Sequence, residues 1–599
     1  MPNKTRSKHR PSGFRAIIAG LASALFFVLA FPPFSLWGAA FLIPFPLFLL
    51  ARSTKSSNKL SPKRAAMLAG IGCMPGWVFT QLWVSEISVA GLVPLVLFLS
   101  SFTTLFVWTA IHLLRRFNRE LIVLPIVWVG VEFFRGSVFG GGYPWYLLAH
   151  PLIDSPKGML ASPASIGGVY FVSFLVACYG VVFMHAITQP TKQLRQRSGL
   201  IAGGFFTAWV GIGYLLIPSA PDNPTTVRIG VIQPDVPQDN RSDWTVRQRL
   251  RDWYTLRDIT LAAASDPTNP GTLDLIVWPE GFVPGWTFDP MSLLTEQREE
   301  LAWNLTPNSP DDVPELTDLP DRVPATMVVE DLHNLQRSLD IPMVVGSVAY
   351  DNLQIVETDD VFEYQRDAMY NSAFAIVNGQ TQPVWYDKVH LTPFGEVMPY
   401  ISSWEWLEQS LLAFGAQGMQ FALDPGEELR LLTIPIDNAN EPTNINLATP
   451  ICFEATVSSV CRELVFDKGT RRTGIMLNLT NDGWFGDSDA GRTAHMLCAR
   501  WRSIELNTPM VRSANTGVSC VIDHIGQVQT QRLTPHHTPT QMPNPRQGYL
   551  IADVVLGQGA TIYAWIGDAF GWACFLTTLV WGITTIFGRS SCVPPPKTE

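Results

Sequence analysis

Apolar residues are distributed unevenly along the chain, in long runs near both ends and in short runs between them. Residues 14–217 and 562–588 are apolar and almost uncharged, whereas residues 218–560 hold most of the Asp and Glu. A helix that crosses a bilayer needs roughly 20 predominantly apolar residues. The pattern predicts a membrane domain over residues 1–217, a water-soluble domain over 218–560, and a last membrane helix with its tail over 561–599.

Seven apolar segments before the soluble region are candidates for membrane helices, and an eighth follows it. The first segment has the basic start and apolar core of a signal peptide, but the spans that follow it favour a retained helix. The expected spans are residues 14–31, 34–51, 65–83, 91–113, 121–134, 165–187, 199–217 and 570–587.

Lys and Arg indicate the orientation, because cytoplasmic loops of membrane proteins carry an excess of both. The N-terminus and every second loop contain fifteen of them, whereas the alternate short loops contain only Arg135 and Lys157. We therefore expect a cytoplasmic N-terminus, and seven crossings then place residues 218–560 outside the cytoplasm. The eighth crossing returns the C-terminal tail to the cytoplasm.

Composition agrees with this division. Of the 599 residues, 16% are charged, whereas soluble globular chains carry about 25%. The net charge of −9 lies in the soluble region, so the charge does not predict nucleic-acid binding. Neither the eight cysteines nor the histidines have metal-ligand spacing, so we expect no metal and no cofactor. Disulfide pairing among Cys461, Cys498 and Cys520 stays open at this point.

One membrane segment, Glu132–Trp145 (EFFRGSVFGGGYPW), differs from an ordinary span. Glu132 and Arg135 are three residues apart and share one helix face. Charged groups in a membrane segment are costly and are therefore functional candidates; a local ion pair at a helix end is the alternative. The glycine run, with Tyr143 and Trp145 after it, predicts a loop with aromatic anchors that could line a lipid entrance.

Short apolar runs alternate with helix-like stretches in the soluble region, which is typical of an α/β fold. Several runs end directly in polar residues, where ligands bind in such folds. Residues 305–325, rich in Pro and Asp, predict a surface insertion, and residues 401–420 predict either a mobile amphipathic arm on the bilayer or an ordinary packed helix. The expected strands are Val227–Ile232, Leu273–Trp278, Met343–Val348, Ser372–Val377, Ile445–Ala448 and Ile475–Leu479.

Three residues that follow strand-like runs could together support nucleophilic catalysis. Cys452 lies at an expected strand-to-helix turn, and a thiolate is a strong nucleophile. It needs a base or a positive charge nearby, which Glu280 and Lys388 would supply. Taken singly, a core Cys, a capping Glu and a solvated Lys are the ordinary interpretations, but the combination favours a catalytic site. Asp482, in NDGWFGD, fits either a turn or that site.

With their flanking residues, these motifs resemble the nitrilase superfamily: a Glu after a strand, Lys in YDKVHLTPFGE and Cys in ICFE. The membrane spans, together with NDGWFGD, RSANTG and EFFRG…GYPW, make nearly the whole chain similar to the apolipoprotein N-acyltransferases, the membrane-embedded branch. The resemblance implies a multi-pass α-helical membrane domain plus an α/β nitrilase-like domain built as an α-β-β-α sandwich.

The resemblance also implies roles for particular residues. Cys452 would be the nucleophile, Glu280 the general base and Lys388 the oxyanion stabiliser. Glu396 would assist the site and Glu454 would help to position it. The residue after the nucleophile, often Tyr in the family, is Phe here, so no chemical role is expected for it. The side chains expected to flank the substrate cavity are Gln233, Trp244 and Trp484.

The implied reaction moves a fatty acyl chain from a phospholipid, with phosphatidylethanolamine as the expected donor, to the amine of a diacylglyceryl-cysteine in an apolipoprotein. A thioester on Cys452 would be the intermediate, and the site would face the periplasm from the bacterial inner membrane. The alternative enzyme is a membrane-tethered amidase that hydrolyses a C–N bond. The two differ in the acyl acceptor, which is water for the amidase and a lipopeptide amine for the transferase. A non-enzymatic scaffold is the other rival, and it predicts a silent Cys452→Ala variant; a transporter fits the large soluble domain poorly.

Overall fold

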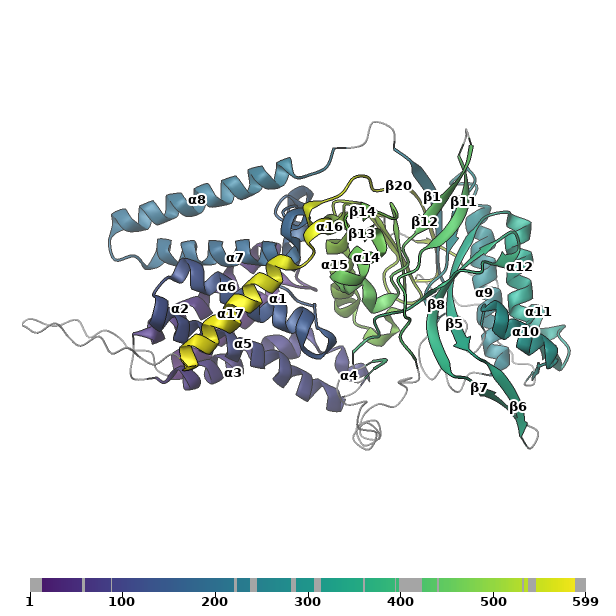
Figure 1. The fold of residues 1–599 in the computed structure, drawn as a ribbon, viewed down its shortest axis with the longest axis horizontal. Coiled ribbons are helices and arrows are strands. Elements are labelled where there is room, and N and C mark those ends of the chain that lie inside the picture. Colours follow the sequence, from purple (N-terminus) through teal and green to yellow (C-terminus); the bar gives the residue numbers. More distant parts are fainter. Residues whose placement is uncertain are drawn as a thin grey trace, which may run out of the picture.

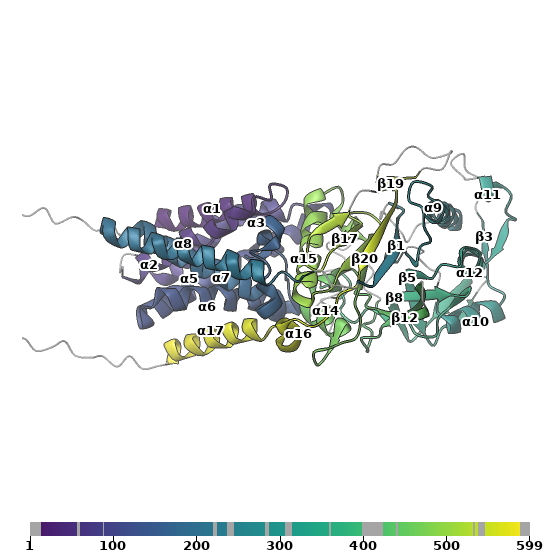
Figure 2. The ribbon, with the colours of Figure 1, turned by 90° about the horizontal axis from the view of Figure 1, so that it is seen from above.

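The computed structural model divides the chain into a helical part and an α/β part at opposite ends of an elongated molecule (Figure 1, Figure 2). Trp244 and residues 401–420 lie outside the described residues, so the cavity role of Trp244 and the expected arm stay predictions. The described residues are 13–56, 60–87, 89–219, 224–236, 245–281, 287–305, 314–358, 361–393, 395–397, 423–438, 441–530, 533–536 and 546–587.

Apolar helices from both ends of the chain form the helical part. Six of the described helical segments are long and apolar enough to cross a membrane. The C-terminal helix α17 packs along α6, where Gly130 allows a close approach, since a Cβ there would lie 2.8 Å from the Cys574 carbonyl oxygen. The helices are α1 (Gly13–Ala30), α2 (Phe45–Lys55), α3 (Pro62–Thr80), α4 (Val84–Ile87), α5 (Val89–Phe117), α6 (Glu120–Phe133), α7 (Ala164–Thr188), α8 (Lys192–Leu215) and α17 (Ala569–Phe587).

Two expected spans are interrupted. Residues 34–51 form a 3-10 helix (Trp37–Leu42) and then α2, because proline provides no backbone N–H to continue a helix and readily starts a new one. Helix α7 bends in its first turn, where Gly168 has φ of +74°. A Cβ at Gly168 would also lie 2.6 Å from the Tyr563 ring, so this bend depends on glycine.

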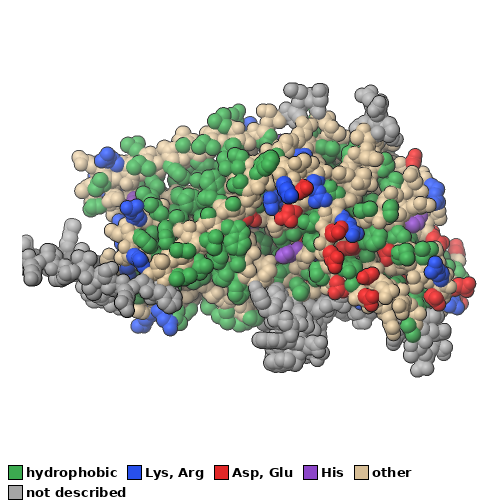
Figure 3. Space-filling model, viewed as in Figure 1, with side chains coloured by type: hydrophobic (Ala, Val, Ile, Leu, Met, Phe, Trp, Pro, Cys, Tyr) green, Lys and Arg blue, Asp and Glu red, His purple; other side chains and the backbone are tan. Residues whose placement is uncertain are grey.

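The surface of the helical part is apolar. Figure 3 shows hydrophobic side chains gathered over the helices and acidic side chains over the α/β part. Leu200 and Leu215 on α8 are 77% and 81% exposed, and Val93 on α5 is 61% exposed. Extended apolar surface of this kind marks contact with lipid or another apolar partner. The expectation of a multi-pass helical membrane domain is confirmed.

Two larger sheets form the α/β part, beside several two-stranded sheets. The larger has the order β10-β8-β5-β2-β1-β20-β19, with β9 beside β8, and the smaller has the order β15-β16-β17-β18. Each of the six expected strands is present. The strands are β1 (Thr226–Gln233), β2 (Leu275–Val277), β5 (Met343–Asp351), β8 (Ala368–Val377), β9 (Gln380–Thr381), β10 (Tyr386–Asp387), β15 (Met476–Thr480), β16 (Met510–Ala514), β17 (Cys520–Ile522), β18 (Val528–Thr530), β19 (Thr534–Pro535) and β20 (Gly548–Val555), with a separate hairpin of β11 (Leu432–Asn438) and β12 (Glu441–Leu447).

The two sheets face each other across one apolar core, which includes Val231, Val277, Leu477 and Val511. Helices α9 (Val246–Ala264) and α12 (Met327–Leu339) cover the outer face of the larger sheet. Helices α14 (Ser458–Val465) and α15 (Asp489–Leu506) lie beside the smaller sheet, on its side toward the bundle (Figure 1). Strands buried on both faces are apolar throughout, which explains their continuous sequence runs. The expected α-β-β-α sandwich is confirmed.

Part of the expected insertion at residues 305–325 is described. Its last residues form β4 (Arg322–Pro324), which pairs with β3 (Ala302–Asn304). Leu316 and Val323 are 0% and 2% exposed, so this end is packed against the domain. Apolar side chains among the Pro and Asp residues anchor it, which the composition of the segment did not indicate.

A buried ion pair joins α15 to the bend in α7. Arg502 Nη2 lies 2.9 Å from Glu505 Oε2, and Glu505 Oε1 accepts a hydrogen bond from the Val169 N–H at 2.8 Å. Both side chains of the pair are under 5% exposed. The Glu505 carboxylate therefore pairs with an arginine of the α/β domain and also accepts a hydrogen bond from the backbone of the membrane domain.

Glu505→Ala is expected to destabilise the protein by about 3–5 kcal/mol, because it leaves the Arg502 charge buried without its partner. Thermal unfolding of the purified protein in detergent measures this as a lower midpoint. Glu463→Ala is the matched control: Glu463 also pairs with an arginine, but its side chain is 52% exposed, so about 1 kcal/mol or less is expected. Equal midpoints for the two variants would contradict the prediction.

Candidate functional site

Cys452 lies at a sharp turn between a strand-like segment and a short helix. Ile451 forms a parallel bridge with Leu479 of β15, and the 3-10 helix Cys452–Thr456 starts at the next residue. Cys452 has φ of +50°, a left-handed conformation that is uncommon for a residue other than glycine. Strained backbone of this kind concentrates at active sites. The residue is only 7% exposed.

Glu280 follows β2 and lies against the thiol. Its Oε1 accepts a hydrogen bond from Asn371 Nδ2 at 2.7 Å. Its Oε2 is buried and accepts no hydrogen bond from an N–H or O–H group of the described residues, whereas the Cys452 thiol is a neighbouring donor to this carboxyl. One carboxylate oxygen is thus fixed and the other remains for the thiol proton.

Lys388 follows β10 and is completely buried between two carboxylates. Its Nζ lies 2.9 and 2.7 Å from the two oxygens of Glu396 and 3.8 Å from Glu280 Oε1. A buried ammonium is unfavourable unless it is paired. Glu396 provides that pairing and leaves Lys388 beside Glu280 as a fixed positive charge.

Burial and charge act against each other in this cluster. Burial raises the pKa of Cys452, and the negative charge of Glu280 raises it further, while Lys388 opposes both. Burial likewise raises the pKa of Glu280 against the effect of Lys388. Burial would lower the pKa of Lys388, but the charge of Glu396 above all raises it. The resting site therefore holds a neutral thiol and an ammonium, and the thiol proton must pass to a base before attack.

Glu454 fastens the nucleophile turn to the segment that carries the lysine. Its Oε1 accepts from the N–H groups of Val389 and His390 at 2.8 and 2.9 Å. Its Oε2 accepts from the Ile451 N–H at 2.8 Å, directly before the cysteine. Glu454 is fully buried, and the Tyr386 hydroxyl also donates to its Oε1 at 2.9 Å. Its place fits the positioning role that the sequence predicts.

The other expected cavity residues that the structure describes are Gln233 and Trp484. Gln233, 1% exposed, donates to the carbonyls of Gly517 and Arg546 and accepts from the Ser519 N–H, so its polar atoms hold backbone. Trp484 is half-buried in the 3-10 helix Asp482–Phe485. The cavity roles of both stay predictions.

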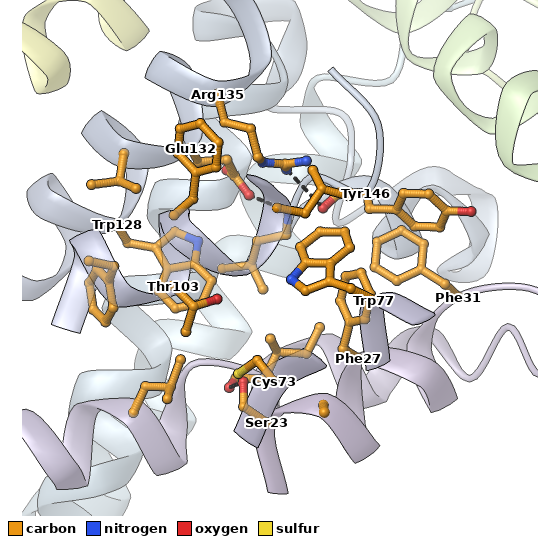
Figure 4. A pocket seen from close by; sticks show the side chains of 18 residues that line it. Ser23, Phe27, Phe31, Cys73, Trp77, Thr103, Trp128, Glu132, Arg135 and Tyr146 are labelled. Carbon is orange, nitrogen blue, oxygen red and sulfur yellow. Dashed lines mark hydrogen bonds between the residues drawn. The ribbon is translucent and has the colours of Figure 1, made fainter. Parts of the chain in front are cut away.

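Glu132 and Arg135 bind the backbone of the loop that follows them, and they form no ion pair with each other. Glu132 Oε1 accepts from the Leu148 N–H at 2.6 Å. Arg135 donates to the carbonyls of Trp145 and Tyr146 at 2.8 and 3.2 Å. Figure 4 shows both side chains turned toward this loop, above a cavity of about 90 Å³ within the bundle. The local ion pair that the spacing allowed is therefore not the arrangement found.

The glycine and aromatic loop is packed between the two domains. Trp145 is 4% exposed, and Tyr143 donates to Gln81 Oε1 at 2.8 Å within the bundle. Gly141 lies within hydrogen-bonding reach of His390, two residues after Lys388. The loop is therefore a contact between the bundle and the catalytic segment. The expectation that it could line a lipid entrance remains a prediction.

The sequence interpretation missed several residues of the site. Asn371, which fixes Glu280, stands directly before an expected strand and has no motif of its own. Asn478 stands three residues before NDGWFGD, and Arg512 is the first residue of RSANTG, so those two motifs were the signal for both residues. The three cysteines whose pairing was open are free. They are Cys461, Cys498 and Cys520.

Comparison with known proteins covers both parts of the chain. Residues 23–182 match the apolipoprotein N-acyltransferase N-terminal domain, and residues 228–554 match the carbon-nitrogen hydrolase family. An apolipoprotein N-acyltransferase of Geobacter metallireducens is 24% identical over 94% of this chain and 93% of its own length. One from Rhodopseudomonas palustris is 29% identical over 86% of each chain.

Among solved structures, an amidase from Nesterenkonia sp. matches 56% of this chain and 93% of its own, with 14% identity and a TM-score of 0.31. The carbon-nitrogen hydrolase match covers more than half of the chain, and the relatives extend across the membrane domain as well. The chain therefore belongs to the carbon-nitrogen hydrolase family, within its membrane-embedded apolipoprotein N-acyltransferase branch.

Proposed function

We propose that the protein transfers a fatty acyl chain from a phospholipid to the N-terminal amine of a diacylglyceryl-cysteine in apolipoproteins, through a thioester on Cys452. The observation that carries the proposal is the buried cluster of Cys452, Glu280 and Lys388, whose lysine segment contacts the loop of the membrane domain through His390 and Gly141. A nucleophile in that place can reach a substrate that arrives from the bilayer.

The first half-reaction acylates the cysteine. Glu280 takes the proton of the thiol, and the thiolate forms a bond to the ester carbonyl carbon of the phospholipid. The Lys388 ammonium stabilises the oxyanion of the tetrahedral intermediate, which is usually a large term in catalysis. The carbon–oxygen bond to the glycerol then breaks, Glu280 returns its proton to the leaving oxygen, and lysophospholipid departs.

The second half-reaction passes the acyl chain to the acceptor. The free amine of the diacylglyceryl-cysteine attacks the thioester carbonyl, and Glu280 takes a proton from the amine. The carbon–sulfur bond breaks, and the sulfur regains a proton from Glu280. One site that serves two substrates in turn predicts ping-pong kinetics. Burial of the cluster supports transfer over hydrolysis, because water has little access to the thioester.

The same proposal includes the acyl donor and the orientation of the protein in the membrane. Phosphatidylethanolamine is the proposed donor, and the catalytic domain is proposed to face the periplasm, with both termini in the cytoplasm. Figure 3 places Lys and Arg at the end of the bundle remote from the α/β part, and basic loops favour the cytoplasmic side. Labelling of single engineered cysteines in intact spheroplasts tests the orientation.

The decisive experiment incubates the purified full-length protein in detergent with a phospholipid that carries a labelled acyl chain, without acceptor. Mass spectrometry of the Cys452 peptide is expected to show the labelled acyl group, and Cys452→Ala is expected to show none. A diacylglyceryl lipopeptide should then discharge the adduct quickly, and water slowly. A folded protein that forms no adduct would contradict the proposal, and rapid discharge by water alone would favour the amidase.

The rate of Cys452 acylation is expected to fall on acidification at a pH above 4.5, the ordinary pKa of a glutamate carboxyl. Burial raises the pKa of Glu280, and below that pKa the carboxyl holds a proton and cannot accept one from the thiol. Above it, the base is free and the rate reaches its plateau. Single-turnover acylation measured against pH tests this, and an acid limb at or below pH 4.5 would be the contrary result.

A further inference from the structure

We propose that Trp145 and His495 are positioning residues, through which the membrane domain holds the nucleophile in its reactive place. The inference rests on the proposed function only in that it takes Cys452 as the nucleophile. An unbroken series of buried contacts, which we call the relay, joins the bundle loop to the backbone of that cysteine. Its members are Arg135, Trp145, His495, Asp482, Arg512 and Asn478.

The relay starts at the carbonyl of Cys452. Asn478 Nδ2 donates to this carbonyl at 3.3 Å and to the carbonyl of Pro450 at 2.9 Å, so one amide holds both sides of the turn. Asn478 Oδ1 accepts from Arg512 Nη1 at 2.8 Å. Because the amide has its donor and acceptor on opposite sides, Arg512 fixes which side of Asn478 meets the nucleophile.

Asp482 connects the guanidinium to the imidazole. Its two oxygens lie 2.6 and 2.7 Å from Arg512 Nη2, and Oδ1 lies 2.9 Å from His495 Nδ1. Burial would raise the pKa of Asp482, but the Arg512 guanidinium lowers it to about 2. The carboxylate is therefore charged at neutral pH, and His495 donates its Nδ1–H to it. All three side chains are at most 3% exposed.

His495 is the point at which the relay enters the membrane domain. Its ring stacks on the Trp145 ring, with centroids 5.4 Å apart and planes at 18°. The carbonyl of Trp145 is held by Arg135 at 2.8 Å. The bundle and the nucleophile are thus linked by a continuous series of side chains, each in contact with the next.

The relay matters for reactivity because the backbone of the nucleophile is strained. The left-handed backbone of Cys452 is strained and persists only while its surroundings hold it. A buried polar series is stiff, because a displaced member would leave its neighbour desolvated and unpaired. If Trp145 moves, His495 loses its support, and the displacement passes through Arg512 and Asn478 to Cys452. The thiol is then out of line with Glu280, so the base activates it only while the membrane loop is seated.

The test measures the reactivity of Cys452 toward iodoacetamide, a soluble probe that needs no lipid site. Full-length protein in detergent is alkylated for timed intervals, and the Cys452 peptide is quantified by mass spectrometry. Trp145→Leu and His495→Leu are expected to slow alkylation about tenfold, a part of the 10²–10⁴-fold that a positioned base supplies. Trp145→Phe, which keeps an aromatic face, is expected to restore most of the rate.

Two further variants test separately the two contacts of His495, the stack on Trp145 and the hydrogen bond to Asp482. His495→Phe keeps the stack on Trp145 but loses the donor to Asp482, whereas His495→Asn keeps a donor and loses the stack. Each is expected to be slower than wild type, because both contacts belong to the relay. In acyl transfer, the same variants are expected to lower kcat and to leave the KM for phospholipid unchanged.

Trp209→Leu controls for the loss of a buried indole. Trp209 packs in the bundle with its Nε1–H on Leu160, away from the relay, so wild-type alkylation is expected even if the unfolding temperature falls. Wild-type alkylation in Trp145→Leu, with a raised KM for phospholipid, would overturn the inference and assign Trp145 to lipid binding alone. Failure of the proposed function is distinct from this, since it would appear as a missing acyl adduct on the wild-type protein.

Discussion

Lys388→Met is expected to lower the rate of Cys452 acylation by phospholipid by about 10³-fold, the upper range for the loss of one oxyanion donor. The lysine is a positive charge beside Glu280, with Nζ 3.8 Å from Oε1, and it opposes the burial that raises the pKa of Cys452. Its loss therefore affects both the thiolate and the tetrahedral intermediate. Single-turnover acylation, followed by mass spectrometry of the Cys452 peptide, measures the effect.

Stability must be separated from chemistry in this variant. Removal of Lys388 leaves the buried carboxylates of Glu396 and Glu280 without their cation, which costs about 3–5 kcal/mol. The double variant Lys388→Met with Glu396→Gln removes one of these charges and is expected to regain stability without regaining activity. Recovery of acylation in the double variant would contradict a direct catalytic role for the lysine.

Glu280→Gln is expected to lower acylation at neutral pH by about 10²–10⁴-fold, the usual contribution of a general base. The amide has the shape of the carboxylate and can still accept from Asn371, which donates to Oε1 at 2.7 Å, so the fold of the site is retained. It cannot accept the thiol proton. The rate is therefore expected to rise continuously with pH as the thiol ionises by itself, without the wild-type plateau.

Glu428→Gln is the matched control for this substitution. Glu428 pairs with Arg430 at the surface, where its side chain is 67% exposed, and its variant should keep the full rate and the wild-type pH profile. A Glu280→Gln variant with the wild-type plateau would show that another group takes the thiol proton. Thermal unfolding of both variants confirms that equal amounts of folded protein are compared.

Local patterns in the sequence were sufficient for many elements of the fold, although β16 and β20 were not among the expected strands. Length and uniform apolarity predicted the helices of the bundle, and short apolar runs such as Val227–Ile232 and Ile475–Leu479 predicted buried strands. These properties depend on residues that are neighbours along the chain, because a helix or strand is specified by its own period and burial. The interruptions before α2, where Pro44 is the N-cap, and at Gly168 were harder to foresee, since proline and glycine also occur within continuous membrane helices.

Particular residues of the site were also predictable one by one. Glu280, Lys388 and Cys452 stood out because each follows a strand-like run within a distinctive motif. Glu132 and Arg135 stood out because charge in an apolar segment is costly. Their interaction was decided elsewhere: both bind the backbone near Trp145, because a nearby loop offered polar groups that were otherwise unpaired inside the bundle.

What the sequence by itself determined is thus many of the helices and strands, the residue types that could react and the two-part organisation. Only the tertiary structure decided that Glu280, Lys388 and Cys452, which are 108 and 64 residues apart, form one buried cluster. The same holds for the packing of Trp145 on His495 of the other domain. Contacts of this kind depend on the order of strands in a sheet and on how two domains pack, and both are set by side-chain fit between segments far apart in the chain.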